Sequence, residues 1–173
     1  MKLINKIEIS NYIYILIMRL SKNFTLYELC KSNTGSRMGI DNSPSPEIIN
    51  NLQLLVVKIL QPLRNQLGPI RVNSGYRSPA LNRAIKGSRN SAHKRGEASD
   101  IIIVRDGKTD NKLIFDSVIE LNLDFDQMIW EFGGKWIHIS YVKDNNRKQI
   151  LEAYKDDNNK TKYKPYPTKY KSL

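Results

Sequence analysis

An amphipathic helix with a clear boundary at each end is the feature that most constrains how this chain folds. Ser45 can cap the first turn, Pro46 suits the first helical position, and Gly68 with Pro69 can end the helix. Apolar side chains recur between these boundaries at helical spacing: Ile48, Leu52, Leu55, Val56, Ile59, Leu63 and Leu67. The pattern predicts one helix over residues 46–67.

Shorter elements are predicted on both sides of this helix. Thr25 and Glu28 form a capping box that opens a short helix, and the polar residues 32–45 predict a loop. The uninterrupted apolar run at 101–104 predicts a strand that is buried on both faces. Further strands are predicted at 70–73, 125–132, 136–142 and 148–154, and further helices at 78–85 and 109–121.

Gly133-Gly134 indicates that two of these strands form a hairpin. A two-residue turn pairs Glu131 with Trp136 and puts Glu131 on the same face as His138. A three-residue turn that includes Lys135 would put Glu131 on the opposite face. We favour the first geometry, because Gly-Gly suits a two-residue turn.

The length of 173 residues indicates one domain with material left over at both ends. We expect an N-terminal extension over residues 1–20, a domain over 21–154 and a basic Lys/Tyr-rich tail over 155–173. The tail is expected to be disordered in isolation, because lysines and prolines separate its tyrosines. The net charge of +11 indicates an anionic partner or serves only solubility, and charge alone does not choose between them.

The apolar run at residues 12–18 is far shorter than the roughly 20 residues of a membrane span. No small-residue cleavage site follows it, so we interpret it as an amphipathic or docking segment rather than an export signal. Cys30 is the only cysteine, which excludes an intrachain disulfide and a four-thiolate zinc site.

The two histidines of the chain and one aspartate form a candidate metal site. His93 lies in a polar loop, and Asp100 follows at the mouth of the buried strand, with Gly96 between them to let the loop turn back. His138 lies on a strand whose alternation also puts Trp136 on its face. Three protein ligands would leave a fourth position for water, as in catalytic zinc sites. On spacing alone, the same residues are more often a surface histidine, a turn-capping aspartate and a core or strand histidine.

Several ordered motifs together resemble the zinc D-alanyl-D-alanine carboxypeptidase family, which shares its fold with the Hedgehog signalling domain and includes endolysins that cut the L-alanyl-D-glutamate bond. The resemblance covers residues 21–143. Its motifs are the S-x-H-x-x-G-x-A-x-D stretch at 91–100, Trp-Ile-His-Ile-Ser at 136–140, Ser-Gly-Tyr-Arg-Ser at 74–78, Phe-Thr-Leu at 24–26 and Phe-Asp-Gln at 125–127.

The resemblance implies an α+β fold, with a small antiparallel sheet and helices packed on one side. It implies that His93, Asp100 and His138 bind Zn²⁺ and that Arg77 stabilises the negative charge on the substrate carbonyl. Ser91 and Trp136 would line the substrate cleft. In several relatives an acid lies three residues before the last histidine, where this chain has Lys135, so Glu131 becomes the candidate general base.

The expected function is zinc-dependent hydrolysis of a peptide bond in the stem peptide of peptidoglycan, by an endolysin-like endopeptidase or a D-Ala-D-Ala carboxypeptidase. The alternative is a catalytically weak or inactive zinc-binding module that serves as a structural or wall-binding virion component. Nucleic-acid binding is disfavoured, because the tail offers only a solvated charge run.

The composition fits a phage-encoded lysin. Such a protein would be synthesised in the cytoplasm without a clear signal peptide and would act on the cell wall. It could be carried in the virion, with residues 1–20 and 155–173 contacting virion proteins.

Overall fold

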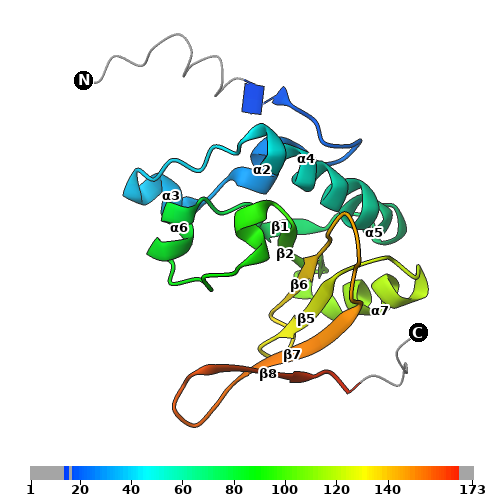
Figure 1. Cartoon of the computed structure of the whole chain (residues 1–173). Coiled ribbons are helices and arrows are strands. Elements are labelled where there is room, and N and C mark those ends of the chain that lie inside the picture. The colour runs from blue at the N-terminus through cyan, green and yellow to red at the C-terminus, as the bar shows by residue number, and fades with distance from the viewer. Residues whose placement is uncertain (1–13, 16, 168–173) are drawn as a thin grey trace.

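The computed structural model describes residues 14–15 and 17–167 (Figure 1). Most of the apolar segment at residues 12–18 is described, but the predictions for residues 1–13 and 168–173 lie outside this part. None of the helices in the described part has the length and apolar composition needed to cross a membrane.

A mixed sheet forms the centre of the molecule. Six strands lie in the order β1-β2-β6-β5-β7-β8, and every neighbouring pair is antiparallel except β5 with β7, which is parallel. The strands are β1 (Arg71–Ser74), β2 (Ala98–Ile102), β5 (Gln127–Glu131), β6 (Trp136–Ser140), β7 (Gln149–Lys155) and β8 (Thr161–Pro165). A separate two-stranded ribbon joins β3 (Val104–Arg105) to β4 (Lys108–Thr109).

The helices begin and end near the predicted boundaries. They are α2 (Leu26–Cys30), α3 (Asn33–Met38), α4 (Pro46–Leu55), the π-helical turn η1 (Val56–Leu60), α5 (Gln61–Leu67), α6 (Pro79–Ala84), the 3-10 turn η2 (Ala92–Arg95) and α7 (Asn111–Glu120). Thr25 and Ser45 cap α2 and α4 as predicted, each hydroxyl accepting a hydrogen bond from a backbone N–H three residues later. The predicted 46–67 helix is confirmed as the continuous run α4-η1-α5, which ends at Gly68.

Helices α2, α4, α5 and α7 cover one face of the sheet, and the site lies on the other face, to which η2 contributes His93. Alternation along β6 turns Ile137 and Ile139 into a core with Leu55 and Ile59 of the long helix and Phe115 of α7. This arrangement confirms the α+β fold (Figure 1), but the expected antiparallel sheet is mixed, because β7 runs parallel to β5. His138, which lies between these isoleucines, and its alternate neighbours Trp136 and Ser140 face away from the helices.

Two local predictions are wrong. Residues 33–38, predicted as loop, form α3, because Ser32 caps the helix and Gly39 ends it in a left-handed conformation. Strand β2 begins at Ala98, three residues before the predicted start, and therefore includes Asp100. Val104 leaves the sheet and is 49% exposed in the β3–β4 ribbon.

The β5–β6 hairpin has the predicted register but a different turn. Glu131 pairs with Trp136, as expected for Glu131 on the face of His138. The connection spans residues 132–135, with positive φ at Phe132 and both glycines, so the predicted two-residue turn is wrong. The backbone N–H groups of Gly134 and Lys135 both donate to the Glu131 carbonyl, which closes this wider turn without changing the pairing.

Part of the basic tail belongs to the sheet. Strand β8 pairs with β7 over residues 161–165, so this segment is ordered within the fold, whereas disorder was expected of the tail in isolation. Tyr166 packs against Phe115 and Trp130, with ring centroids 4.5 and 5.9 Å away. The open edge of β7 and this aromatic contact supply the pairing and burial that the tail lacks in isolation.

Candidate metal centre and active-site cleft

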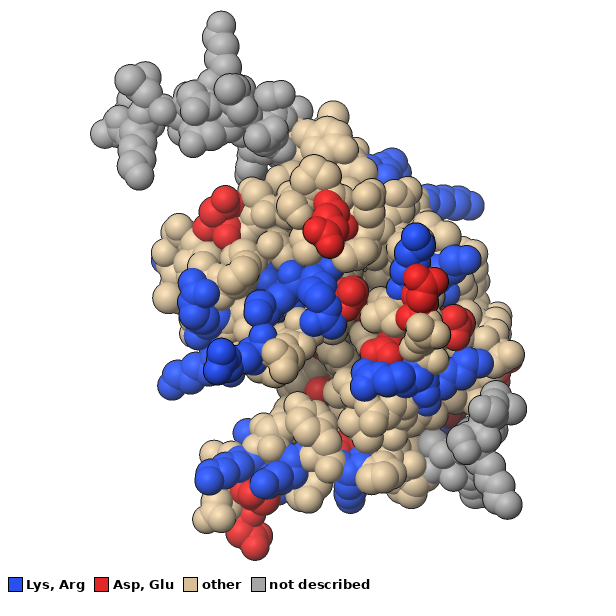
Figure 2. Space-filling view, in the orientation of Figure 1, with Lys and Arg blue, Asp and Glu red and all other residues tan. Residues whose placement is uncertain are grey.

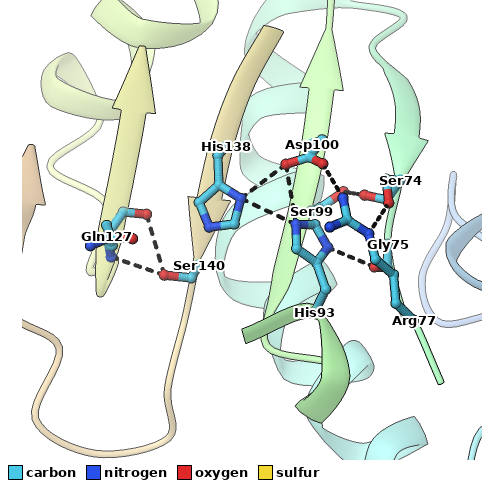
Figure 3. A network of polar contacts seen from close by, with 9 residues as sticks. All are labelled: Ser74, Gly75, Arg77, His93, Ser99, Asp100, Gln127, His138 and Ser140. Atoms are coloured by element: carbon cyan, nitrogen blue, oxygen red, sulfur yellow. Dashed lines mark hydrogen bonds and ion pairs between the residues drawn. The ribbon is translucent and has the colours of Figure 1, made fainter. Parts of the chain in front are cut away.

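Three potential metal ligands converge on the free face of the sheet (Figure 3). Asp100 of β2 pairs directly with His138 of β6, and η2 brings His93 to the same point. Asp100 Oδ1 lies 2.9 Å from His138 Nδ1 and 3.2 Å from His93 Nε2, and the two imidazole nitrogens are 3.2 Å apart. One ligand atom from each residue lies within 4.8 Å of the others.

A backbone carbonyl on the side of the ring away from the cluster fixes the orientation of His93. Its Nδ1 lies 2.7 Å from the carbonyl oxygen of Gly75, so Nδ1 carries the proton and Nε2 presents a lone pair to the cluster. Gly75 also lies against α2, where any Cβ would collide with the Leu29 carbonyl. The Gly75 position therefore requires glycine, and the close packing holds the carbonyl that orients His93.

Gly96 turns the loop between His93 and Asp100, as predicted. Its φ of +72° is left-handed, and it ends η2 directly before the chain enters β2. A Cβ at this position would lie 2.8 Å from the Ile48 carbonyl of α4. Conformation and packing together explain why glycine stands here.

The cluster is buried and electrostatically coupled. His93 is 3% exposed, and burial lowers its pKa despite the neighbouring Asp100 carboxylate. Burial alone would raise the pKa of Asp100, but the charges of His93 and His138 and their hydrogen bonds hold it well below its ordinary value. At neutral pH the cluster therefore presents an ionised carboxylate and a neutral His93 imidazole.

Arg77 holds the other oxygen of the same carboxylate. Its Nη2 donates to Asp100 Oδ2 at 2.5 Å, and its Nε donates to the Ser74 hydroxyl at 2.8 Å. This leaves Oδ1 of Asp100 for the two histidines. The side chain of Arg77 is 16% exposed, so its guanidinium also reaches the cleft described next.

A cleft of about 780 Å³ opens over the cluster. Ser91 and Trp136, the predicted substrate-binding residues, both line it, as do Arg77 and Glu131. Figure 2 shows the hollow between the body of the molecule and the β7–β8 arm, with Lys and Arg side chains on both sides. The structure thus brings the candidate metal ligands, the candidate base, Arg77 and the two predicted substrate-binding residues to one cavity.

Glu131 is the acid beside the candidate metal ligands. It is 8% exposed and shares the sheet face of His138. Burial raises the pKa of Glu131 to about 7, although the nearby His138 charge opposes the shift. A carboxyl that titrates near neutral pH can both accept and return a proton. Lys135 is exposed in the turn.

Sequence reasoning missed two parts of the cleft. Thr161 and Tyr163 of β8 line it, and the alternation in Thr-Lys-Tyr-Lys-Pro was the signal that could have predicted a strand there. Arg147 also lines it and forms a two-pronged ion pair with Asp126, at 2.7 and 2.6 Å. This pair assigns Asp126 to structure, because Arg147 occupies both of its oxygens and lowers its pKa.

The donor set fits a small divalent metal such as zinc. An imidazole lone pair, a second imidazole nitrogen and an ionised carboxylate oxygen converge within one coordination sphere. The Gly75 carbonyl accepts a hydrogen bond from the other nitrogen of His93, and the Arg77 guanidinium donates one to the other oxygen of Asp100, and such bonds commonly orient metal ligands. His93, Asp100 and His138 thus remain the candidate ligands.

This fold and cleft define a class: α+β proteins with a candidate two-histidine, one-aspartate metal site beside a protonatable carboxyl. The family follows from the sequence comparison. The chain belongs to the Peptidase M15 family, whose model matches residues 22–140. This match confirms the family that the motifs indicated.

The chain was also compared with curated proteins and with solved structures. No curated protein matches the chain. Among solved structures, the L-Ala D-Glu endopeptidase ChiX of Serratia marcescens is 20% identical, with a TM-score of 0.35 over 57% of this chain and 89% of that one.

Proposed function

We propose that this chain is a zinc-dependent peptidase that hydrolyses a peptide bond in the stem peptide of bacterial peptidoglycan. The observation that carries the proposal is the convergence of His93, Asp100 and His138 beside Glu131 in one cleft of a Peptidase M15 chain. Zinc held by these three side chains would supply Lewis-acid chemistry at the scissile carbonyl.

Glu131 is the proposed general base and acid. Its carboxylate takes the proton of the attacking water and passes it to the leaving amine. The pKa near 7 and the shared face with His138 support this role. The acid that several relatives carry at the position of Lys135 is, in this proposal, replaced by an acid across the hairpin.

Arg77 has two proposed roles. Its bond to Asp100 supports a positioning role for the carboxylate that would bind the metal. Its place in the cleft supports stabilisation of the negative charge that builds on the scissile carbonyl oxygen.

The lining of the cleft is suited to an anionic peptide. Ser91 and Trp136 offer a hydroxyl and an aromatic surface, and Lys86 and Arg95 add positive charge at the rim. Stem peptides of peptidoglycan carry free carboxylates, which these cations can attract. Both an internal bond, as for an endolysin endopeptidase, and a terminal D-Ala-D-Ala bond are compatible with this lining.

The biological setting that we infer is a phage lysin that acts on the cell wall. The Asn-, Lys- and Ile-rich composition supports it, and the basic C-terminal residues offer a docking element for virion proteins. The alternative is a zinc-binding virion component with weak or no activity, which Lys135 in place of the usual acid favours.

Release of muropeptides from purified peptidoglycan tests the proposal. Wild-type protein with zinc is expected to release fragments whose masses identify the bond, and a chelator or His138→Ala should abolish the release. Zinc bound at one equivalent without any release would instead support the non-catalytic alternative.

A further inference from the structure

The β7–β8 hairpin forms one wall of the cleft. Leu151 of β7 and Thr161 and Tyr163 of β8 line the cavity, across from Ser91 and the η2 turn. Figure 2 shows the hairpin as an arm below the hollow. This wall lies beyond residue 140, where the match to the peptidase family ends.

Strand register links Tyr163 to the catalytic face. Glu131 pairs with Ala153 across β5 and β7, and Ala153 pairs with Tyr163 across β7 and β8. Paired residues share a face, so Tyr163 and Glu131 lie on one surface with only the small side chain of Ala153 between them. Ala153 itself is fully buried, whereas Tyr163 and Glu131 on either side of it both line the cleft.

The Tyr163 hydroxyl is available for a ligand. The side chain is 54% exposed, and the hydroxyl forms no hydrogen bond with any residue in the described part of the chain. Burial of the other half of the ring raises the pKa of Tyr163, and the charges of Glu131 and Asp100 add to the shift. The hydroxyl therefore keeps its proton and can donate a hydrogen bond toward the cleft.

We propose that Tyr163 is a substrate-binding residue, whose ring forms the wall of the cleft and whose hydroxyl donates a hydrogen bond to a peptide carbonyl of the stem peptide near the scissile bond. The proposal rests on the proposed function for the identity of the ligand. It assigns the β7–β8 hairpin to substrate binding.

Tyr154 provides a matched control. It lies in the same hairpin, is 40% exposed, and projects from the opposite face, because its neighbour Ala153 is the partner of Tyr163. The Lys164 ammonium lies 5.4 Å from its ring centroid, away from the cleft. A Tyr154→Phe change thus removes an equivalent hydroxyl from the hairpin without touching the proposed substrate wall.

Steady-state hydrolysis of a soluble stem peptide compares the variants. Tyr163→Phe is expected to lower kcat/KM by about 3- to 10-fold, the usual worth of one neutral hydrogen bond. Tyr163→Ala, which also removes the ring, should lower it further, and Tyr154→Phe should leave it unchanged. Equal values for Tyr163→Phe and Tyr154→Phe would overturn the proposal while leaving the peptidase function intact.

Equilibrium binding of the same peptide to chelator-treated protein separates the two claims, because no turnover is needed. Weaker binding by Tyr163→Phe than by Tyr154→Phe supports the contact even if the wild type proves inactive. Identical binding by both variants, or no binding by wild type, would rule the contact out.

Discussion

The carboxylate of Asp100 and the imidazole of His138 face each other across the β2–β6 pair, with Oδ1 2.9 Å from Nδ1. This pairing comes from backbone hydrogen bonds between two buried strands, so the sheet itself sets the separation. Only His93 reaches the cluster from outside the sheet.

Removing any of the three candidate ligands should abolish tight zinc binding. His93→Ala, Asp100→Asn and His138→Ala are each expected to weaken zinc affinity by at least about 100-fold, because two ligands cannot hold a catalytic zinc. Titration with zinc in a calorimeter measures the effect. Ser99→Ala is the control, since the Ser99 hydroxyl donates a hydrogen bond to the Ser74 carbonyl and lies outside the cluster. If one of the three variants still binds zinc as tightly as wild type, the residue changed in it is not a zinc ligand.

The close packing at Gly75 predicts that adding even one methyl group there destabilises the fold. Gly75→Ala should lower the free energy of unfolding by about 2–3 kcal/mol, because the new Cβ meets the Leu29 carbonyl. It should also weaken zinc binding, since the displaced carbonyl no longer orients His93.

Gly39→Ala is the matched comparison. Gly39 has a φ of +62° but open space around it, so Gly39→Ala should lower the free energy of unfolding by only about 1 kcal/mol. Urea unfolding measures the free energy of unfolding of both variants. An equal loss of stability in the two would contradict the proposed packing constraint at Gly75.

The raised pKa of Glu131 predicts how stability depends on pH in zinc-free protein. Burial lifts the folded-state pKa from 4.5 to about 7, so the folded state holds a proton that the unfolded state has lost. Stability should therefore fall as the pH rises through this window and then level off. Glu131→Gln removes the titration, and its stability relative to wild type should increase by about 1–3 kcal/mol between about pH 4.5 and 8.

Chemical unfolding with chelator present at both pH values measures this change. Glu120→Gln, at an exposed position in α7, should show no comparable trend. If the difference in unfolding free energy between wild type and Glu131→Gln did not change with pH, Glu131 would not be buried as described.

Two tyrosines of the basic tail should differ in their effect on stability. Tyr166 packs on Phe115 and Trp130, so Tyr166→Ala should destabilise the fold by about 1–3 kcal/mol. Tyr163→Ala should change stability by less than about 1 kcal/mol, because its side chain is half exposed. Thermal unfolding compares them, and a reversed order would contradict the assignment of one tyrosine to the core and the other to the cleft.

The sequence predicted the site better than it predicted the edges of the sheet. The caps at Thr25 and Ser45 are local features that could be read from short segments, whereas the correct Glu131–Trp136 register was predicted from a two-residue turn that the structure does not have. The cluster could be anticipated because the chain has only two histidines.

What could not be predicted depends on contacts between distant segments. Strand β8 exists because β7 offers an open edge and because Tyr166 reaches Phe115, some 50 residues earlier in the chain. The His93 tautomer depends on the Gly75 carbonyl, which α2 holds in place. The alternation in residues 161–165 favours a strand but does not say which strand it pairs with, and the His93 tautomer leaves no pattern in the sequence.

The most direct test of the central claim measures zinc content and muropeptide release on the same preparation of Glu131→Gln. If Glu131 is the base beside a zinc site formed by His93, Asp100 and His138, the variant should bind one zinc with wild-type affinity and release fragments at least about 100-fold more slowly. Release at the wild-type rate by zinc-loaded Glu131→Gln would contradict the account.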